Sequence, residues 1–351
     1  MDFIVAATEL NTIGKLIYNV VYQWVLTWGN DFTWIGAFGV TVIIFTLMLK
    51  IVTSPFDVWQ KTLTRKNAKI MEIMKPELDK ITKQCGDNRE LLMQKQREVY
   101  KKYNYSMFST CLPTVLTLVI FILVFSGFNS SVRHYNSTVF ENLQEVYEQT
   151  YDDEVAALQD SGLTNIEIKE RATQAAEEAV VESYKPESIL FTQNIFMPDT
   201  WRNPIPTAED YSGSGIGKLN IPTDATEYEK VMKPIITKYN ASGNWNGYLI
   251  FPILAFVLNI FSTRLMAGQM QPPQMAGQTA EQKKAQESQQ KLMQYMMPVM
   301  MAVFALFYST AFTLYLLSNS AITTIFNLVY NRVAKVKDAK KKEKRLSTTL
   351  K

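Results

Sequence analysis

The chain has 351 residues, of which 47% are hydrophobic and 20% are charged, and its 36 basic and 33 acidic side chains give a net charge of +3. This small excess predicts no specific nucleic-acid partner. With one histidine, His134, two cysteines and no catalytic motif, we expect no enzyme activity, cofactor, metal site or disulfide framework.

The first predicted element is an amphipathic helix between Asn11 and Trp28, within an N-terminal segment of residues 1–30. Its apolar residues recur with helical spacing, and two Trp and two Tyr are typical of a helix in the membrane interface. The alternative is a sixth, unusually polar span. The start, MDFIVAATEL, lacks the basic and apolar regions of a signal peptide, so none is expected.

Five apolar stretches approach the roughly 20 residues that a helix needs to cross a bilayer. The predicted transmembrane helices are residues 31–57, 107–128, 247–264, 292–309 and 312–331. Pro55 and Asp57 are expected to end the first. The last two are nearly continuous, so the chain is expected to reverse at the polar point Ser309-Thr310-Ala311.

The segments between the spans differ in charge. Residues 58–106 carry a dozen basic side chains and are predicted to form a helical hairpin, with its turn at Cys85-Gly86-Asp87-Asn88. Residues 129–246 carry about twice as many acidic as basic side chains. Within this acidic segment, one helix is predicted near residues 140–147. Thr164 and Glu167 predict a capping box at the start of a second helix, which extends to about Ser183. Residues 265–291 are a predicted loop, and the basic tail 332–351 is predicted to be disordered beyond Lys337.

Charge also predicts the orientation. The basic hairpin and tail belong in the cytosol, which places the acidic insertion and the N-terminus outside. We therefore expect an all-α integral membrane protein of the bacterial plasma membrane, with five transmembrane helices, a cytosolic helical hairpin and a partly helical extracytoplasmic insertion.

Lys50 is the strongest candidate for a functional residue. It is the only charge between Trp34 and Phe56, and an ionisable residue inside a span is costly unless it has a function. The alternative is a long side chain that reaches the cytosolic headgroups. A Ser54–Lys50 catalytic pair is the weakest interpretation, because no other catalytic group accompanies it.

Polar residues of other spans are candidates to share an interior with Lys50. Asn319, Thr323 and Asn327 recur every four residues and share one helix face. Asn259 and Thr117 lie in two further spans. Such residues predict a hydrophilic groove that lowers the cost of moving a polar segment of another protein into the bilayer. The alternative is ordinary hydrogen bonding between membrane helices.

Methionines are frequent near the predicted cytosolic side. Met71, Met74 and Met93 of the hairpin, with Arg89, are candidate docking residues, because flexible thioethers suit varied apolar partners. The alternative is that these methionines fill gaps in a helical core.

Five stretches, in this order, resemble the YidC/Oxa/Alb family of membrane protein insertases: LMLKIVTSPF, MEIMKPELDKI, CLPTVLTLVIFILVFSGF, NIFMPDT and YMMPVMMAVFALFYSTAFTLYLLSNS. The resemblance implies a five-span core with a groove open to the cytosol and lipid, and a positive groove charge that attracts substrate segments. Lys50 stands where the family usually has arginine, Thr117 where an amide is expected, and Leu316 where an aromatic residue is common.

The resemblance thus implies an insertase or chaperone for nascent membrane proteins within the lipid bilayer, with the ribosome and the secretion channel as further partners. The lysines of the tail are expected either to touch ribosomal RNA or to face lipid and water. The alternative function is a secondary transporter or channel with Lys50 as an ion or solute site, although no internal repeat is seen. A membrane enzyme is the third possibility.

Overall fold

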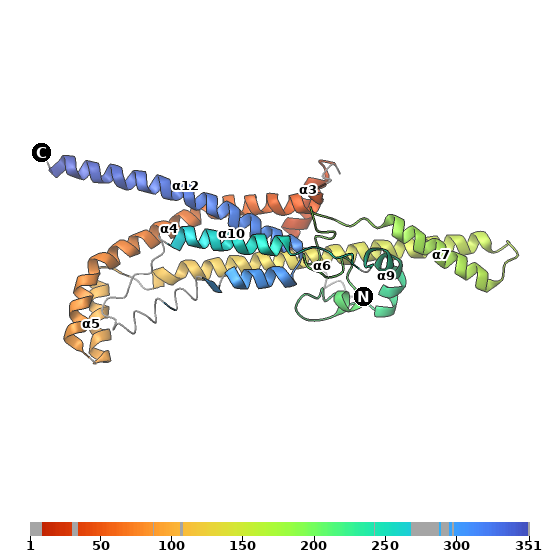
Figure 1. The fold of residues 1–351 in the computed structure, drawn as a ribbon, viewed down its shortest axis with the longest axis horizontal. Helices are drawn as coiled ribbons and strands as arrows, with labels where there is room; N and C mark the ends of the chain where they lie inside the picture. Colours follow the sequence, from red (N-terminus) through yellow and green to blue (C-terminus); the bar gives the residue numbers. More distant parts are fainter. Residues whose placement is uncertain are drawn as a thin grey trace. The chain divides into compact units, whose positions relative to one another are not determined.

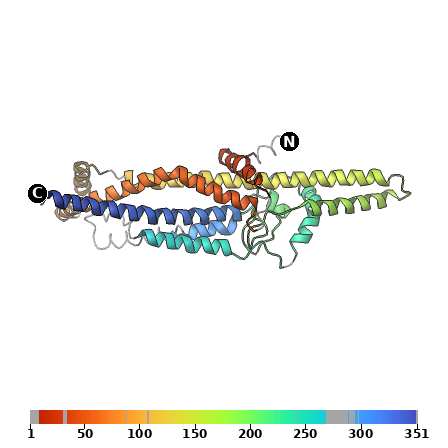
Figure 2. The ribbon, with the colours of Figure 1, turned by 90° about the horizontal axis from the view of Figure 1, so that it is seen from above.

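The computed structural model describes residues 9–29, 34–86, 88–105, 108–241, 243–267, 288, 295–296 and 298–349. Helices and the loops that join them make up these ranges (Figures 1 and 2). The elements are α2 (Thr12–Lys15), the π-helix η1 (Leu16–Tyr22), α3 (Gln23–Leu26), α4 (Gly36–Cys85), α5 (Arg89–Lys102), α6 (Phe108–Leu158), α7 (Asn165–Ser183), α8 (Ala208–Ser212), α9 (Ala225–Tyr239), α10 (Ile250–Ala267) and α12 (Thr310–Thr349).

The chain divides into two compact units. The first comprises Met1–Phe45, Ile122–Ala255 and Met301–Leu317, and the second comprises Thr46–Phe121, Phe256–Met300 and Ser318–Lys351. Helices α4, α6, α10 and α12 contribute residues to both units.

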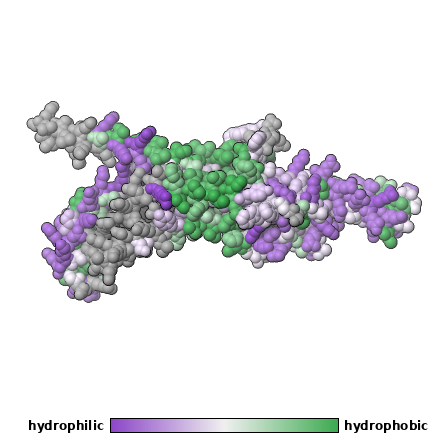
Figure 3. Space-filling model, in the orientation of Figure 1, coloured by the Kyte–Doolittle hydropathy of each residue, from purple (hydrophilic) through white to green (hydrophobic). Residues whose placement is uncertain are grey.

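Three of the described helices are long and apolar enough to cross a bilayer, within Gly36–Cys85, Val115–Leu158 and Thr310–Lys337. Two shorter apolar helices are Ile250–Arg264 and Pro298–Phe307. Figure 3 shows hydrophobic residues gathered around α10, whereas α7 is mostly hydrophilic. The all-α architecture is confirmed, and the number of five spans stays a prediction.

The predicted N-terminal helix is present from Thr12 to Leu26 as α2, η1 and α3. Asn11 caps its start by accepting a hydrogen bond from the Gly14 amide at 2.7 Å. One face, with Ile17, Val21 and Val25, is buried in the protein. The adjacent face is apolar and exposed, with Leu16, Val20, Trp24 and Trp28. An interfacial position is in keeping with these two apolar faces.

Two predicted helix ends are wrong, because helices α4 and α6 continue beyond them. Helix α4 passes through Pro55 and Pro76 and forms the first arm of the basic hairpin as well as the first apolar span. Helix α6 runs 51 residues from Phe108 to Leu158, so the separate helix expected near 140–147 is part of it. Gly and Pro are lacking between residues 128 and 158, so no helix breaker interrupts α6 before the turn at Gly162.

The predicted reversal near Ser309 is confirmed. The apolar helix Pro298–Phe307 ends just before it, and α12 begins at Thr310. The expected disorder beyond Lys337 is wrong, because α12 continues to Thr349. This tail contains neither Gly nor Pro and is rich in Lys, which favours helix.

One loop, residues 194–200, anchors the starts of two apolar helices. The Met197 carbonyl accepts hydrogen bonds from the backbone and the hydroxyl of Thr310, at 2.9 and 2.8 Å, at the start of α12. The buried Asp199 carboxylate accepts bonds from the amides of Leu249 and Phe251, at 3.1 and 2.7 Å, at the start of α10. This loop therefore satisfies amides that these helices leave without internal partners.

The acidic segment folds around a core of its own. The C-terminal half of α6 and α7 run side by side (Figure 2), and α8 and α9 pack against their base. The predicted capping box at the start of α7 is confirmed, because Thr164 and Glu167 exchange hydrogen bonds. The core contains Phe140, Leu143, Tyr147, Ala176, Val180, Ile205, Tyr211, Ile221, Tyr228, Val231, Met232 and Ile235.

Candidate functional site

Lys50 and Asp57 lie seven residues apart on α4, so they project from the same face two turns apart. Lys50 Nζ lies 2.6 Å from Asp57 Oδ2. Only 12% of the Lys50 side chain and 21% of the Asp57 side chain are exposed. A charge-assisted hydrogen bond is stronger in such surroundings than in water, so the two groups form a shielded ion pair.

Pro55 lies between the two partners and cannot donate a hydrogen bond to the carbonyl of Ile51, one turn earlier. The hydroxyl of Ser54 donates to that carbonyl at 2.9 Å instead. The helix therefore passes the proline without a break, which keeps Lys50 and Asp57 in register.

Helix α12 supplies two further contacts to Lys50. The hydroxyl of Thr323 accepts a hydrogen bond from Lys50 Nζ at 3.0 Å. The same ammonium lies 5.2 Å from the ring centroid of Phe326, within the range of a cation–π interaction. We refer to Lys50, Asp57, Thr323 and Phe326 as the Lys50 cluster.

A second lysine lies on the same aromatic ring. Lys61 Nζ is 5.1 Å from the centroid of Phe326 and 5.2 Å from that of Tyr330. The Arg65 guanidinium lies 5.9 Å from the Tyr330 ring. Cations of α4 and aromatic rings of α12 thus alternate from Lys50 toward the hairpin, and this row provides positive charge between the two helices.

A polar residue next to the predicted polar face of α12 contacts α10. Ser320 Oγ lies 3.3 Å from Asn259 Oδ1, and Thr324 donates to the Ser320 carbonyl at 2.7 Å. Asn327 is buried on the same helix. Asn259 therefore joins α10 to α12 through Ser320, in line with ordinary hydrogen bonding between membrane helices.

The structure brings together only part of the predicted groove. Thr323 contacts Lys50 directly, whereas Asn319 is half-buried and Thr117 lies exposed on α6. The site residues predicted from the sequence did not include Asp57, Phe326 or Lys61. The spacing of Lys50 and Asp57, two full helical turns, is the signal that identifies the ion pair once α4 is known to continue through Pro55.

The basic hairpin has a small core of its own, in which the α4 arm and α5 lie side by side (Figure 1). Met71 and Met74 are buried there with Leu78 and Val99, which favours the alternative that they fill a helical core over direct contact with a docking partner. Met93 is 55% exposed. The side chain of Arg89 lies outside the described residues.

A polar cluster joins the α4 arm of the hairpin to the end of α5. Lys102 bonds Glu77 at 2.7 Å, and the Tyr103 hydroxyl donates to Glu77 at 2.9 Å. The hydrogen bond from Lys102 and the one from Tyr103 lower the pKa of the Glu77 carboxyl. Glu77 is therefore ionised at neutral pH and holds α5 against α4.

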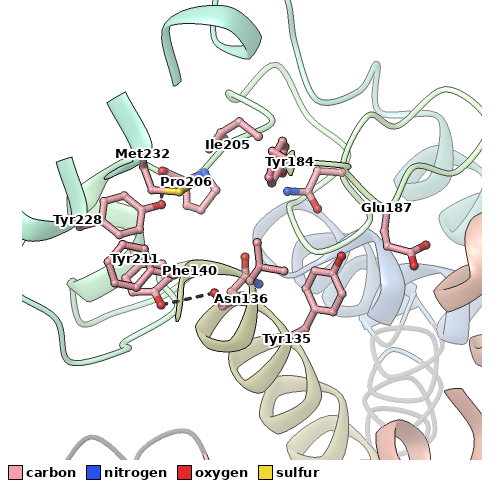
Figure 4. Close-up of a pocket in the computed structure, with 12 residues that line it drawn as sticks. Tyr135, Asn136, Phe140, Tyr184, Glu187, Ile205, Pro206, Tyr211, Tyr228 and Met232 are labelled. Carbon is pink, nitrogen blue, oxygen red and sulfur yellow. Dashed lines mark hydrogen bonds between the residues drawn. The ribbon is translucent and has the colours of Figure 1, made fainter. Parts of the chain in front are cut away.

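The acidic segment contains a small pocket between α6, α9 and the loop after α7 (Figure 4). Its aromatic wall includes Tyr184 and Tyr228, and burial raises the pKa of both phenols. Tyr211 donates a long hydrogen bond, 3.5 Å, to the Asn136 carbonyl. Glu187 accepts one from Tyr22 at 2.9 Å. These side chains hold each other in place, and no nucleophile–base pair is among the residues lining the pocket.

Comparison with known proteins points to one family. A family model described as 60Kd inner membrane protein matches residues 31–339. A Membrane protein insertase YidC of Fusobacterium nucleatum is 29% identical over 117 residues, which cover 33% of this chain and 55% of that protein. The Clostridium tetani protein of the same name is 35% identical over 94 residues, 27% of this chain and 41% of its own. The protein of that name from Leptospira interrogans is 31% identical over 114 residues, which cover 32% of this chain and 17% of that protein.

The matched part thus spans about half the length, or less, of these curated relatives. The family model covers most of this chain, including the Lys50 cluster, both hairpin arms and the acidic segment.

Proposed function

Because the chain belongs to the 60Kd inner membrane protein family, we propose that it is a membrane protein insertase with the Lys50 cluster at its working site. The observation that carries the proposal is the shielded Lys50 ammonium, which bonds Thr323 on a second apolar helix. A polar segment of a substrate entering the bilayer loses its hydration, and a fixed positive charge offsets part of that cost for an acidic segment.

The proposed topology has five spans, with the N-terminus and the acidic segment outside and the basic hairpin and the C-terminus in the cytosol. It is supported by the twelve basic residues of the hairpin, by the lysines at the end of α12 and by the excess of acidic residues between 129 and 246. In this proposal the third and fourth spans are formed by the two shorter apolar helices, Ile250–Arg264 and Pro298–Phe307.

In the proposed mechanism a nascent membrane protein first meets the hairpin. Its short polar segment then moves along the row of cations toward Lys50, and its apolar segment passes into lipid. Burial of apolar surface drives release. The ribosome is a proposed partner because it would deliver the nascent chain. The secretion channel is the second proposed partner, because it would act on the same substrates. The relatives give no support to a transporter.

The test is insertion of a single-span substrate into proteoliposomes that contain the wild type, Lys50→Arg or Lys50→Ala. We expect Arg to retain insertion, because it keeps the charge, and Ala to lose most of it. Removal of Lys50 also leaves Asp57 without its partner, so Lys50→Ala/Asp57→Asn is needed to remove both charges at once. Lys66→Ala removes an exposed charge from the same helix and serves as the control.

If the double variant inserts as well as the wild type, the Lys50 cluster has only a structural role. If the wild type inserts nothing beyond protein-free liposomes, the insertase proposal itself fails.

A further inference from the structure

The ammonium of Lys50 already holds a carboxylate. Its contacts are Asp57 at 2.6 Å, the Thr323 hydroxyl at 3.0 Å and the ring of Phe326. Asp57 belongs to the same helix, and the carboxylate occupies the position that an acidic side chain of a second protein would take next to Lys50. An acidic residue that binds Lys50 therefore competes with Asp57 for the same positive charge.

Displacement has a cost, because both partners are largely shielded from water. A shielded charge without a counter-ion is strongly unfavourable, so Asp57 can leave Lys50 only if another cation receives it. This requirement distinguishes an exchangeable ion pair from a purely structural one.

Lys61 meets that requirement. It lies four residues, about one turn, after Asp57 on the same face of α4, and the charge of Asp57 acts on it. Its ammonium lies 5.1 Å from the centroid of the same Phe326 ring on which Lys50 rests. Asp57 therefore lies between two lysines that share one aromatic ring.

A change of partner keeps both carboxylates paired with a cation. In the resting arrangement Asp57 pairs with Lys50, and Lys61 rests on Phe326 and Tyr330. With a substrate carboxylate on Lys50, the Asp57 side chain turns toward Lys61. No unpaired carboxylate remains in either arrangement, which lowers the cost of the exchange.

We propose that Asp57 is a built-in competitor for Lys50 and limits the advantage that segments with carboxylates have in insertion. The inference rests on the proposed insertase function and assigns two residues to it: Asp57 as the internal competitor and Lys61 as its acceptor during exchange. Segments without acidic residues do not displace Asp57 and gain nothing from Lys50.

The test uses two single-span substrates that differ only in the translocated segment, which carries aspartates in one and asparagines in the other. Both are offered together to proteoliposomes with limiting insertase, and the ratio of inserted acidic to inserted amide substrate is measured. This ratio does not depend on the fraction of insertase that is folded.

We expect Asp57→Asn to raise the acidic-to-amide ratio about fivefold, which corresponds to about 1 kcal/mol of lost competition. Asp57→Glu keeps the competing charge and should leave the ratio near that of the wild type. Lys61→Gln removes the acceptor and should lower the ratio. Glu72→Gln removes an exposed acid from the same helix and is the matched control.

An unchanged ratio in Asp57→Asn, with a ratio that still depends on Lys50, would overturn the inference and leave the insertase function standing. An equal loss of both substrates in Asp57→Asn would assign Asp57 a structural role only. If the wild type inserts neither substrate, the insertase function fails and the inference fails with it.

Discussion

The carboxylate of Asp199 accepts a hydrogen bond from the Phe251 amide at 2.7 Å, although 52 residues separate the two in sequence. Asp199 is 1% exposed and also accepts a bond from Leu249. It caps α10 from a distant loop, and the Leu249 backbone has a positive φ of 64° at the same point. A strained residue just before a helix needs such external support.

Asp199→Ala should therefore destabilise the first unit by about 2 kcal/mol, because it leaves two amides at the helix start without an acceptor. Thermal unfolding of the purified protein in detergent measures the effect. Asp160→Ala, at an exposed aspartate of the same segment, should leave the unfolding temperature nearly unchanged.

Gly247→Ala tests the same contact from the other side. A Cβ atom at Gly247 would overlap the Asp199 carboxylate. The carboxylate must then move away from the α10 amides, so this variant should resemble Asp199→Ala in the same melting experiment. A melting temperature equal to that of the wild type would mean that Asp199 is free to shift and that its cap contributes little.

Substitution of the buried Met74 should cost more stability than substitution of its exposed neighbour Ile73. Met74→Ala should cost about 2–5 kcal/mol of hairpin stability, since it opens a cavity in the core with Met71, Leu78 and Val99. Ile73→Ala, at a residue that is 63% exposed, should cost less than about 0.5 kcal/mol. Hydrogen exchange of α5 amides distinguishes the two.

Met93 remains a candidate for docking, because it is exposed on α5. Met93→Ala should weaken cross-linking of a nascent chain to the hairpin without faster exchange of the α5 amides. If Met74→Ala and Met93→Ala reduce cross-linking in proportion to lost hairpin stability, the methionines serve the fold alone.

The sequence predicted which stretches are apolar better than where helices end. The reversal at Ser309, the turn around Gly86 and the cap at Thr164 were found because each depends on local chemistry. The ends of α4 and α6 were placed wrongly, because a change from apolar to polar residues marks the membrane boundary and does not stop a helix. Only helix breakers do that, and Pro55 is accommodated by the Ser54 hydroxyl.

The candidate site was predicted in part for the same reason. Lys50 and Thr323 follow from an isolated charge and a polar helix face, and the structure joins them. Asp57 was taken as the end of the span, so its position on the face of Lys50 was missed. Pairing between residues of different helices, such as Asn259 with Ser320, depends on packing that periodicity does not specify.

The pH dependence of the acidic segment should follow Asp210 and Lys218, which form an ion pair at 2.8 Å beside the cap of α8. Burial raises the pKa of Asp210, but hydrogen bonds from Lys218 and Thr207 outweigh it, and the pKa is lowered overall. Hydrogen bonds to Asp210 and Glu209 raise the pKa of Lys218.

The lowered pKa of Asp210 means that its contribution to stability is present above its ordinary value, about pH 4, and is lost as the pH falls through the folded pKa. The raised pKa of Lys218 means that its contribution is present below about pH 10.5 and is lost as the pH rises further. Hydrogen exchange of the amides of Ala208–Ser212 should therefore accelerate at both extremes.

Asp210→Asn should remove the acid limb of this dependence and speed exchange at neutral pH. Glu209→Gln is the control, since Glu209 also bonds Lys218 but its side chain is 83% exposed and does not cap the helix. Equal effects of the two substitutions would show that the ion pair, and not the cap, holds α8.

The contact of the N-terminal helix with α6 depends on Gly127. A Cβ atom there would lie 2.7 Å from the Ile13 Cβ and closer still to its γ-methyl group. Around this contact, Asn11 donates to the hydroxyls of Ser126 and Ser130, both at 2.9 Å. The lack of a side chain at Gly127 thus allows a close approach that these hydrogen bonds then fix.

Gly127→Ala should push the segment 12–26 away from α6, even though Ala favours helix more than Gly does. Its amides should exchange at least about tenfold faster, a change of about 1.4 kcal/mol in the opening free energy. Leu123→Ala, four residues earlier and 52% exposed, is the control and should leave exchange unchanged. Adding Ile13→Ala to Gly127→Ala removes the overlapping γ-methyl group and should slow exchange again. If it does not, the acceleration arises within α6 and not from the steric contact.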